Sequence, residues 1–140
     1  MTDLQSYTFD FQRVSDFFDR WNVSFKTNGD FNENNKFEVV FCNYAYDDIS
    51  KMLTSSGTLN SGANVYATQN CRLNWADETI TIGGNVTFDL GTSIVPLKAL
   101  FIRHKKSGVV LGYSININDF EVTNQLVISS GTILWSIRDV

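Results

Sequence analysis

The sequence predicts a mainly β protein: an antiparallel β-sandwich or jelly roll with a short N-terminal helical and aromatic segment. Three observations lead to this prediction. From residue 37 onward, short runs rich in β-branched and aromatic residues recur every 8–12 residues or so, which is typical of sandwiches. Turn residues separate these runs, and no alternation of strands with helices indicates a parallel sheet. The chain has 140 residues, 43% of them apolar and 14% aromatic, enough for the core of one domain.

The first 36 residues differ from the rest. Apolar side chains recur there at alternating three- and four-residue spacings, as in an amphipathic helix, at Leu4, Tyr7, Phe11, Val14, Phe18 and Trp21. Strict alternation of Tyr7, Phe9 and Phe11 instead predicts a strand over 7–11, and both interpretations place a helical turn or two at 13–21. A polar loop follows. We therefore expect an N-terminal segment over 1–36 and a β-sandwich domain over 37–140.

The run 37–46 is apolar on both of its alternating faces, which predicts a central or covered strand. Asp47 and Asp48 then suit the cap of a short helix that extends through Leu53 and ends at the Ser-Ser-Gly run 55–57. Short strands are expected around 64–68 and 71–76.

Glycines at 83 and 84 predict a hairpin with a three-residue loop, 83–85. This register places Ile82 opposite Val86 and Ile80 opposite Phe88, so that apolar side chains share one face. The threonines at 79, 81 and 87 then lie on the outer face.

In the last third, a strand is expected to begin at Pro96 or to lie at a sheet edge, because proline has no amide to donate. The turn 104–108 would leave His104 on the surface. Alternation over 109–118 predicts a strand with one buried face, and Ile133, Trp135 and Ile137 predict a final strand.

Composition excludes several classes of function. A net charge of −4, with only eleven Lys and Arg, argues against a nucleic-acid binder. No apolar run is long enough to span a membrane, and the first residues lack the basic and apolar regions of a secretory signal. Cys42 and Cys71 lie in apolar runs, so we expect free, buried thiols.

No catalytic, cofactor or metal site is predicted. His104, the one histidine, lies beside two lysines, and the paired acids at 47–48 and 77–78 suit caps and turns. Asp30, Asn32 and Asn34 begin like a calcium loop, but position six is Asn35 instead of glycine and position twelve is Phe41 instead of glutamate.

Four pieces, 85–91, 96–103, 107–113 and 128–135, resemble in their order the C-terminal part of small virion structural proteins of tailed bacteriophages. The resemblance implies a capsid auxiliary or decoration protein, a head-fibre component, or a connector or tail adaptor. It would assemble in the host cytoplasm with other virion proteins (capsid, portal or tail) and with copies of itself.

The aromatic seam either packs on the protein's own sheet, which we favour, or contacts a neighbour; the interface candidates are Tyr7, Phe11, Phe18 and Trp21. The alternative function is a carbohydrate-binding module, which would expose an aromatic platform. Trp21, Trp75 and Trp135 are the flat side chains considered for it, although tryptophans in a sandwich are more often in the core.

Overall fold

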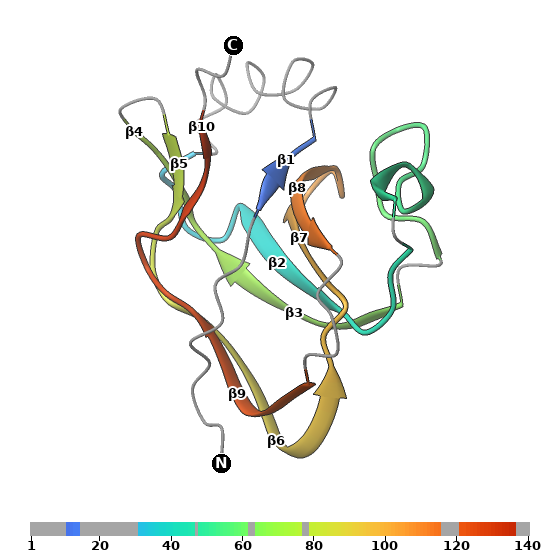
Figure 1. The fold of residues 1–140 in the computed structure, drawn as a ribbon. Helices are drawn as coiled ribbons and strands as arrows, with labels where there is room; N and C mark the ends of the chain where they lie inside the picture. Colours follow the sequence, from blue (N-terminus) through green and yellow to red (C-terminus); the bar gives the residue numbers. More distant parts are fainter. Residues whose placement is uncertain are drawn as a thin grey trace.

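The computed structural model describes residues 11–14, 31–46, 48–61, 64–76, 79–115 and 121–136. It confirms a mainly β protein whose strand pairings are antiparallel (Figure 1). The elements are β1 (Gln12–Arg13), β2 (Phe37–Cys42), the 3-10 helix η1 (Ile49–Lys51), β3 (Val65–Cys71), β4 (Leu73–Ala76), β5 (Thr79–Ile82), β6 (Val86–Pro96), β7 (Ala99–His104), β8 (Val110–Ile115), β9 (Glu121–Ile128) and β10 (Ile133–Ser136).

A five-stranded sheet in the order β1-β8-β7-β2-β3 forms one layer. Its strand β2 lies between β7 and β3, and both of its faces are buried, as the apolar run predicts. Alternate side chains enter different cores: Phe37, Val39 and Phe41 enter the main core, whereas Val40 and Cys42 enter a second cluster on the other face. A strand covered on both faces favours apolar residues on both, which explains its composition apart from Glu38.

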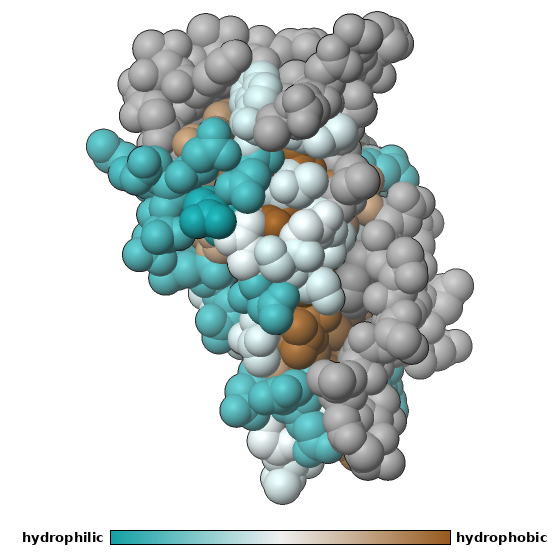
Figure 2. Space-filling model, turned by 90° about the vertical axis from the view of Figure 1, so that its left-hand side faces the viewer, coloured by the Kyte–Doolittle hydropathy of each residue, from teal (hydrophilic) through white to brown (hydrophobic). Residues whose placement is uncertain are grey.

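Two smaller sheets, β10-β5-β4 and β6-β9, follow each other along the left-hand side of Figure 1 and together form a long ribbon that faces the five-stranded sheet. Strand β5 pairs with β10, and β6, which follows β5 in the chain, pairs with β9. Strand β4 extends the upper part of the ribbon by pairing with β5. Among the residues coloured by hydropathy in Figure 2, the side shown is largely hydrophilic to neutral, with apolar residues visible only in places. The ribbon thus presents a mostly polar outer face.

The hairpin expected at 83–85 is wrong. Ile82 pairs with Leu73, and Val86 pairs with Ile128, so the chain bends at the glycines and continues in the same ribbon. The partner strands β9 and β10 are separated at the same level by residues 129–132. There the Gly131 amide donates to the Ile82 carbonyl over 2.7 Å. The expected burial of Ile80, Ile82, Val86 and Phe88 is correct. A bend preserves the alternation of faces as well as a hairpin does, so the pattern did not distinguish them.

The main core lies between the sheet and the ribbon. Its largest fully buried side chains include Phe37 and Phe41 from the sheet and Phe88 from the ribbon. The rings of Phe41 and Phe88 meet edge to face, with 5.4 Å between centroids and 66° between planes. This contact joins the two layers, and burial of each such ring contributes about 1.5–3 kcal/mol.

A second, smaller core lies on the other face of the sheet. It holds Val40, Phe101 and Val110, and the segment 45–59 covers it through Met52, which is fully buried. Asp48 caps η1 as expected, since its Oδ1 accepts from the Ser50 amide over 3.0 Å. The expected helix is, however, a 3-10 turn of three residues that ends at Lys51.

Strand β8 does not have the single buried face that its alternation predicts. A register shift between Ile102 and Arg103 of β7 interrupts its pairing. As a result Leu111 enters the main core, whereas Val110 and Tyr113 contact the second core. Both faces are covered, and a bulge of this kind leaves no clear mark on residue periodicity.

Pro96 lies at an edge, as expected, but it ends β6 instead of beginning a strand; β7 starts anew at Ala99. At the N-terminal side, Gln12 and Arg13 are extended and pair with Tyr113 and Gly112 of β8. The expected helical turn therefore does not begin at residue 13, and positions 15–21 lie outside the described residues.

Candidate interaction surface

Strand β3 forms an open edge of the five-stranded sheet. Among the described strands it pairs only with β2. Five of its first six residues are exposed, with side chains that point to both faces; Ala67 is half-buried and only Cys71, at the end, is buried. An open edge presents unpaired backbone donors and acceptors that can accept a further strand.

Exposed apolar side chains gather where β2 ends and β3 begins. We call this group the tyrosine edge: Tyr44, Tyr46, Val65 and Tyr66, each between 39% and 46% exposed. Backbone pairing holds its two segments together, because Cys42 pairs with Val65 and the Asn43 amide donates to the Asn64 carbonyl over 3.3 Å.

The rings of the tyrosine edge are held in defined positions. Tyr44 and Tyr46 meet edge to face, with 5.4 Å between centroids and 78° between planes. Tyr66 packs on the buried ring of Phe41 at 5.6 Å. The Tyr46 amide also points to the sulfur of Met52 at 3.1 Å. Ordered tyrosines lose little side-chain freedom on binding, which is why they are enriched at contact surfaces.

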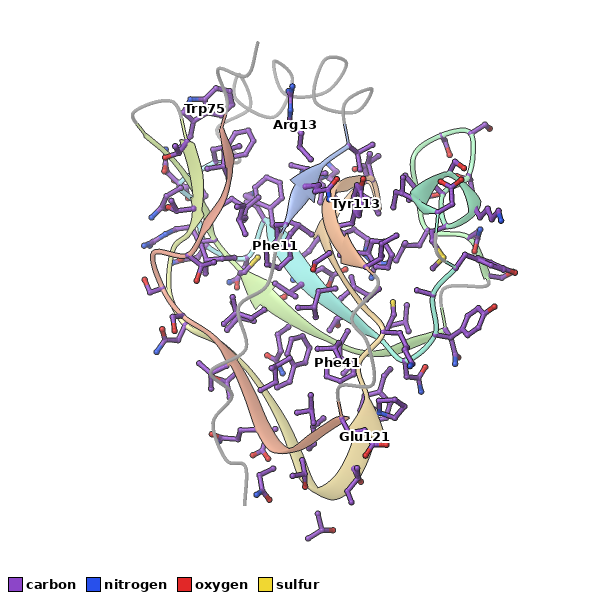
Figure 3. All side chains as sticks on the ribbon, viewed as in Figure 1. Phe11, Arg13, Phe41, Trp75, Tyr113 and Glu121 are labelled. Carbon is purple, nitrogen blue, oxygen red and sulfur yellow. The ribbon has the colours of Figure 1, made fainter. Side chains whose placement is uncertain are left out.

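Of the interface candidates named from the sequence, the structure describes Phe11. Its side chain is only 7% exposed and belongs to the main core, so this aromatic residue packs on the protein's own sheet (Figure 3). Beside it, the Tyr113 hydroxyl donates to Gln12 Oε1 over 3.2 Å. Tyr7, Phe18 and Trp21 lie outside the described residues.

His104 is not on the surface, contrary to expectation. It is the last residue of β7 and is 6% exposed. Its Nδ1 accepts from the Ser107 amide at 3.2 Å and lies 2.9 Å from the Ser107 hydroxyl, while its ring meets Phe37 at 5.4 Å. Because Nδ1 is an acceptor, the ring proton lies on Nε2. The buried His104 ring thus stabilises the turn between β7 and β8 by hydrogen bonding to Ser107.

The other groups considered for chemistry have structural partners. Cys42 and Cys71 are free and buried, as expected, and burial raises the pKa of each thiol to about 12. Such thiols are protonated and unreactive at neutral pH. Asn32 of the calcium-like loop accepts from the Trp75 amide through Oδ1 at 3.0 Å. In the part of the chain that the structure describes, no three His, Cys, Asp or Glu side chains gather as a metal site would require.

The tyrosine edge was not found from the sequence. The sequence places Tyr44 and Tyr46 at the end of a covered strand, because the run rich in β-branched and aromatic residues continues through residue 46. The strand in fact ends at Cys42. The available signal in the sequence was the polar Asn43, which follows the last residue of the strand. In the structure its Oδ1 is buried without a partner among the described atoms.

No protein-family model, curated protein or solved structure matches this chain. Over the described residues, no helix has the length and apolar character needed to cross a membrane. The four pieces that resemble phage virion proteins lie mainly in β6 to β10, in both the sheet and the ribbon.

Proposed function

We propose that this chain is a non-enzymatic structural subunit of a tailed-bacteriophage particle: a capsid auxiliary or decoration protein, a head-fibre component, or a connector or tail adaptor. It acts by burying surface against other virion proteins and against copies of itself. The tyrosine edge and the open edge of β3 are the contact surface. The particle is assembled in the host cytoplasm.

One observation carries this proposal: among the described strands β3 pairs on one side only, and the exposed tyrosine edge, with Tyr66 from β3, lies at its start. Natural proteins usually protect such an edge with charged side chains or proline. The run from Val65 to Cys71 contains neither. A strand of a neighbouring subunit can pair with it through the backbone, while the tyrosines add apolar contact area.

Two measurements test the proposal. Peptide mapping of purified phage particles encoded beside this gene should find the protein, and its absence would overturn the assignment to the virion. Light scattering of the isolated protein should give a multiple of 15.8 kDa. Tyr66→Lys should lower that mass, whereas Thr92→Lys, at an exposed site in β6, should not. Equal masses for both variants would remove β3 from the interface.

A carbohydrate-binding module is the second candidate, and the exposed Tyr44 and Tyr46 favour it. Aromatic rings that face solvent can stack on sugar rings. Their planes lie at 78°, however, so the pair offers one flat ring and one edge instead of a continuous platform. Quenching of tyrosine emission by oligosaccharides, lost in Tyr44→Ala, would support this function. An unchanged spectrum across a broad glycan panel would exclude it.

A further inference from the structure

A small polar cleft lies away from the tyrosine edge, where three segments meet. The loop 31–36, the junction of β3 with β4, and the glycine bend 83–85 line a volume of about 260 Å3. This is slightly below the roughly 300–1,000 Å3 of typical small-molecule pockets, so it suits one small group. We call it the amide cleft; its lining residues with polar side chains are Asn34, Asn35, Asn70, Arg72 and Asn85.

Arg72 brings a fixed positive charge to the amide cleft. Its Nε donates to Asn74 Oδ1 over 3.0 Å, and Nη1 lies 3.5 Å from Asn34 Oδ1. Gly83 makes room for this side chain, because a Cβ there would lie 2.7 Å from the Arg72 Nε. The guanidinium is therefore positioned by neutral amides and by a missing side chain.

Within the described ranges, no carboxylate pairs with the Arg72 guanidinium. Its hydrogen-bond partners there are Asn74 and Asn34, both neutral amides. Arg103 shows the contrast: its Nε and Nη2 lie 2.8 and 2.7 Å from Glu38 Oε2. A guanidinium has five N–H donors, so Arg72 retains at least three for a ligand.

The asparagines of the cleft add donors and few acceptors. Asn34 Oδ1 faces the Arg72 guanidinium, Asn70 Oδ1 accepts from Lys105 Nζ over 2.7 Å, and Asn85 Oδ1 accepts from the Ser130 amide over 2.7 Å. All three partners can only donate, which fixes which atom of each amide is the oxygen. The carbonyl oxygens are thus used within the protein, and the NH2 groups remain.

We propose that the amide cleft binds a small oxyanion, a carboxylate, phosphate or sulfate group, held by the Arg72 guanidinium and the asparagine NH2 groups. Among the described residues, no aspartate or glutamate lines the cleft, to which the loop 31–36 contributes Asn34 and Asn35, although the chain as a whole carries a net charge of −4. Lys105, bound to Asn70, adds a second positive charge at the rim. Planar, bidentate recognition of an oxyanion is the task to which arginine is best suited. The cleft lies at the Cys71 end of β3, opposite the end that carries the tyrosine edge, and anion binding is inferred from the residues of the cleft and not from the proposed virion contacts.

The test uses isotope-labelled full-length protein titrated with inorganic phosphate, sulfate, glucuronate and, as a neutral reference, glucose. Side-chain amide and arginine Nε signals should shift with at least one of the three anions and not with glucose. Preference for glucuronate over phosphate and sulfate assigns an acidic sugar, whereas the reverse assigns a phosphate or sulfate ester. No shift with any anion overturns the proposal.

Two variants separate binding from folding. Asn85→Asp keeps an oxygen that accepts from the Ser130 amide but replaces the NH2 donor by a negative oxygen, and residue 85 is exposed. Arg72→Gln removes the guanidinium. Each should weaken anion affinity by about tenfold or more, since charge-assisted bonds are lost. Lys51→Gln, which removes one charge from η1, is the matched control and should bind like the parent. Unchanged affinity in Asn85→Asp would also overturn the proposal.

Discussion

Strands β2 and β3 are neighbours in one sheet and have similar lengths, six and seven residues, yet β2 is almost fully buried and β3 is mostly exposed. In β2 every side chain except that of Glu38 is buried. In β3 only Cys71 is buried. The two strands pair from Phe37 opposite Cys71 to Cys42 opposite Val65, with one register shift between Phe41 and Cys42, so hydrogen bonding alone does not account for the difference.

The difference lies in what covers each strand. Strand β2 has the ribbon on one face and the segment 45–59 on the other, and a strand on each side. Strand β3 has one paired neighbour, and its polar side chains match that position. Burial in this sheet is therefore set by the layers above and below a strand. Substitutions in the covered strand β2 should accordingly destabilise the protein more than substitutions in β3.

The largest effect on stability is expected when one aromatic side chain is truncated in each strand. Phe41→Ala should lower the free energy of unfolding by about 3–5 kcal/mol, because it removes a fully buried ring that contacts Phe88. Tyr66→Ala, in the paired strand β3, should lower the free energy of unfolding by about 1 kcal/mol or less, since Tyr66 is 42% exposed. Urea denaturation measures both. Similar losses would show that β3 is covered in solution.

The second prediction concerns the thiols at the end of each strand. Burial raises the pKa of Cys42 and Cys71 from 9.0 to about 12, so the folded state holds their protons more tightly than the unfolded chain does. This stability is fully present below about pH 9 and is lost as the pH rises toward 12, by up to about 1.4 kcal/mol per pH unit for each thiol.

Urea denaturation at pH 8 and pH 10 tests this prediction against Cys42→Ala/Cys71→Ala. The double variant should lose less stability over that interval than the parent, because tyrosine and lysine titration is common to both proteins. Equal losses would contradict the burial of the thiols. Each single variant then shows whether Cys71, on the edge strand, is as well shielded as Cys42.

A smaller effect is expected from a cross-strand pair of polar residues. Glu38 and Asn70 lie opposite each other, but Glu38 binds Arg103 and is mostly buried, whereas Asn70 binds Lys105 in an exposed position. Glu38→Gln should cost about 1–2 kcal/mol, because it leaves a partly buried guanidinium without its counter-charge. Asn70→Ala should stay within about 0.5 kcal/mol. Thermal unfolding at one pH compares the two, and a larger loss in Asn70→Ala would reverse their ranking.

The smallest effect on stability is expected from replacing Asp48, in the segment that covers the second core. The Ser50 amide lowers the pKa of Asp48 by hydrogen bonding to its carboxylate. A lowered pKa stabilises the folded state above the ordinary aspartate range, and this contribution is lost as the pH falls through the folded pKa. Asp48→Asn should therefore show a slightly flatter acid denaturation profile than the parent. A steeper profile would contradict the cap.

The sequence was sufficient for the fold class and for most strands, because alternation and turn residues report which side chains are buried. It was not sufficient for connectivity at the glycine bend. Ile82 and Val86 keep the same faces whether the chain turns back or continues, and the choice depends on a distant partner, Ile128. The burial of His104 was also missed, since a turn in the sequence does not show which side chain fills its inside.

The candidate surface was harder to predict than the fold. Phe11 was named as an interface candidate, but its ring fills the main core. Tyr44 and Tyr66 were not named, because an exposed and a buried aromatic residue look alike in a short β-rich run. The amide cleft was missed for a related reason: its donors come from segments that are distant in sequence, such as Asn34 and Asn85.

The ribbon formed by β5, β6, β9 and β10 has a consequence for synthesis on the ribosome. Of the strands that the structure describes, β5 and β6 pair only with strands of residues 121–136, apart from the pairing of β5 with β4. While the chain is being made, β6 has no partner strand until β9 has been translated. Long-range pairing of this kind slows folding and exposes apolar strands to aggregation. Slower translation between residues 96 and 121 would lengthen that interval and reduce the yield of native protein.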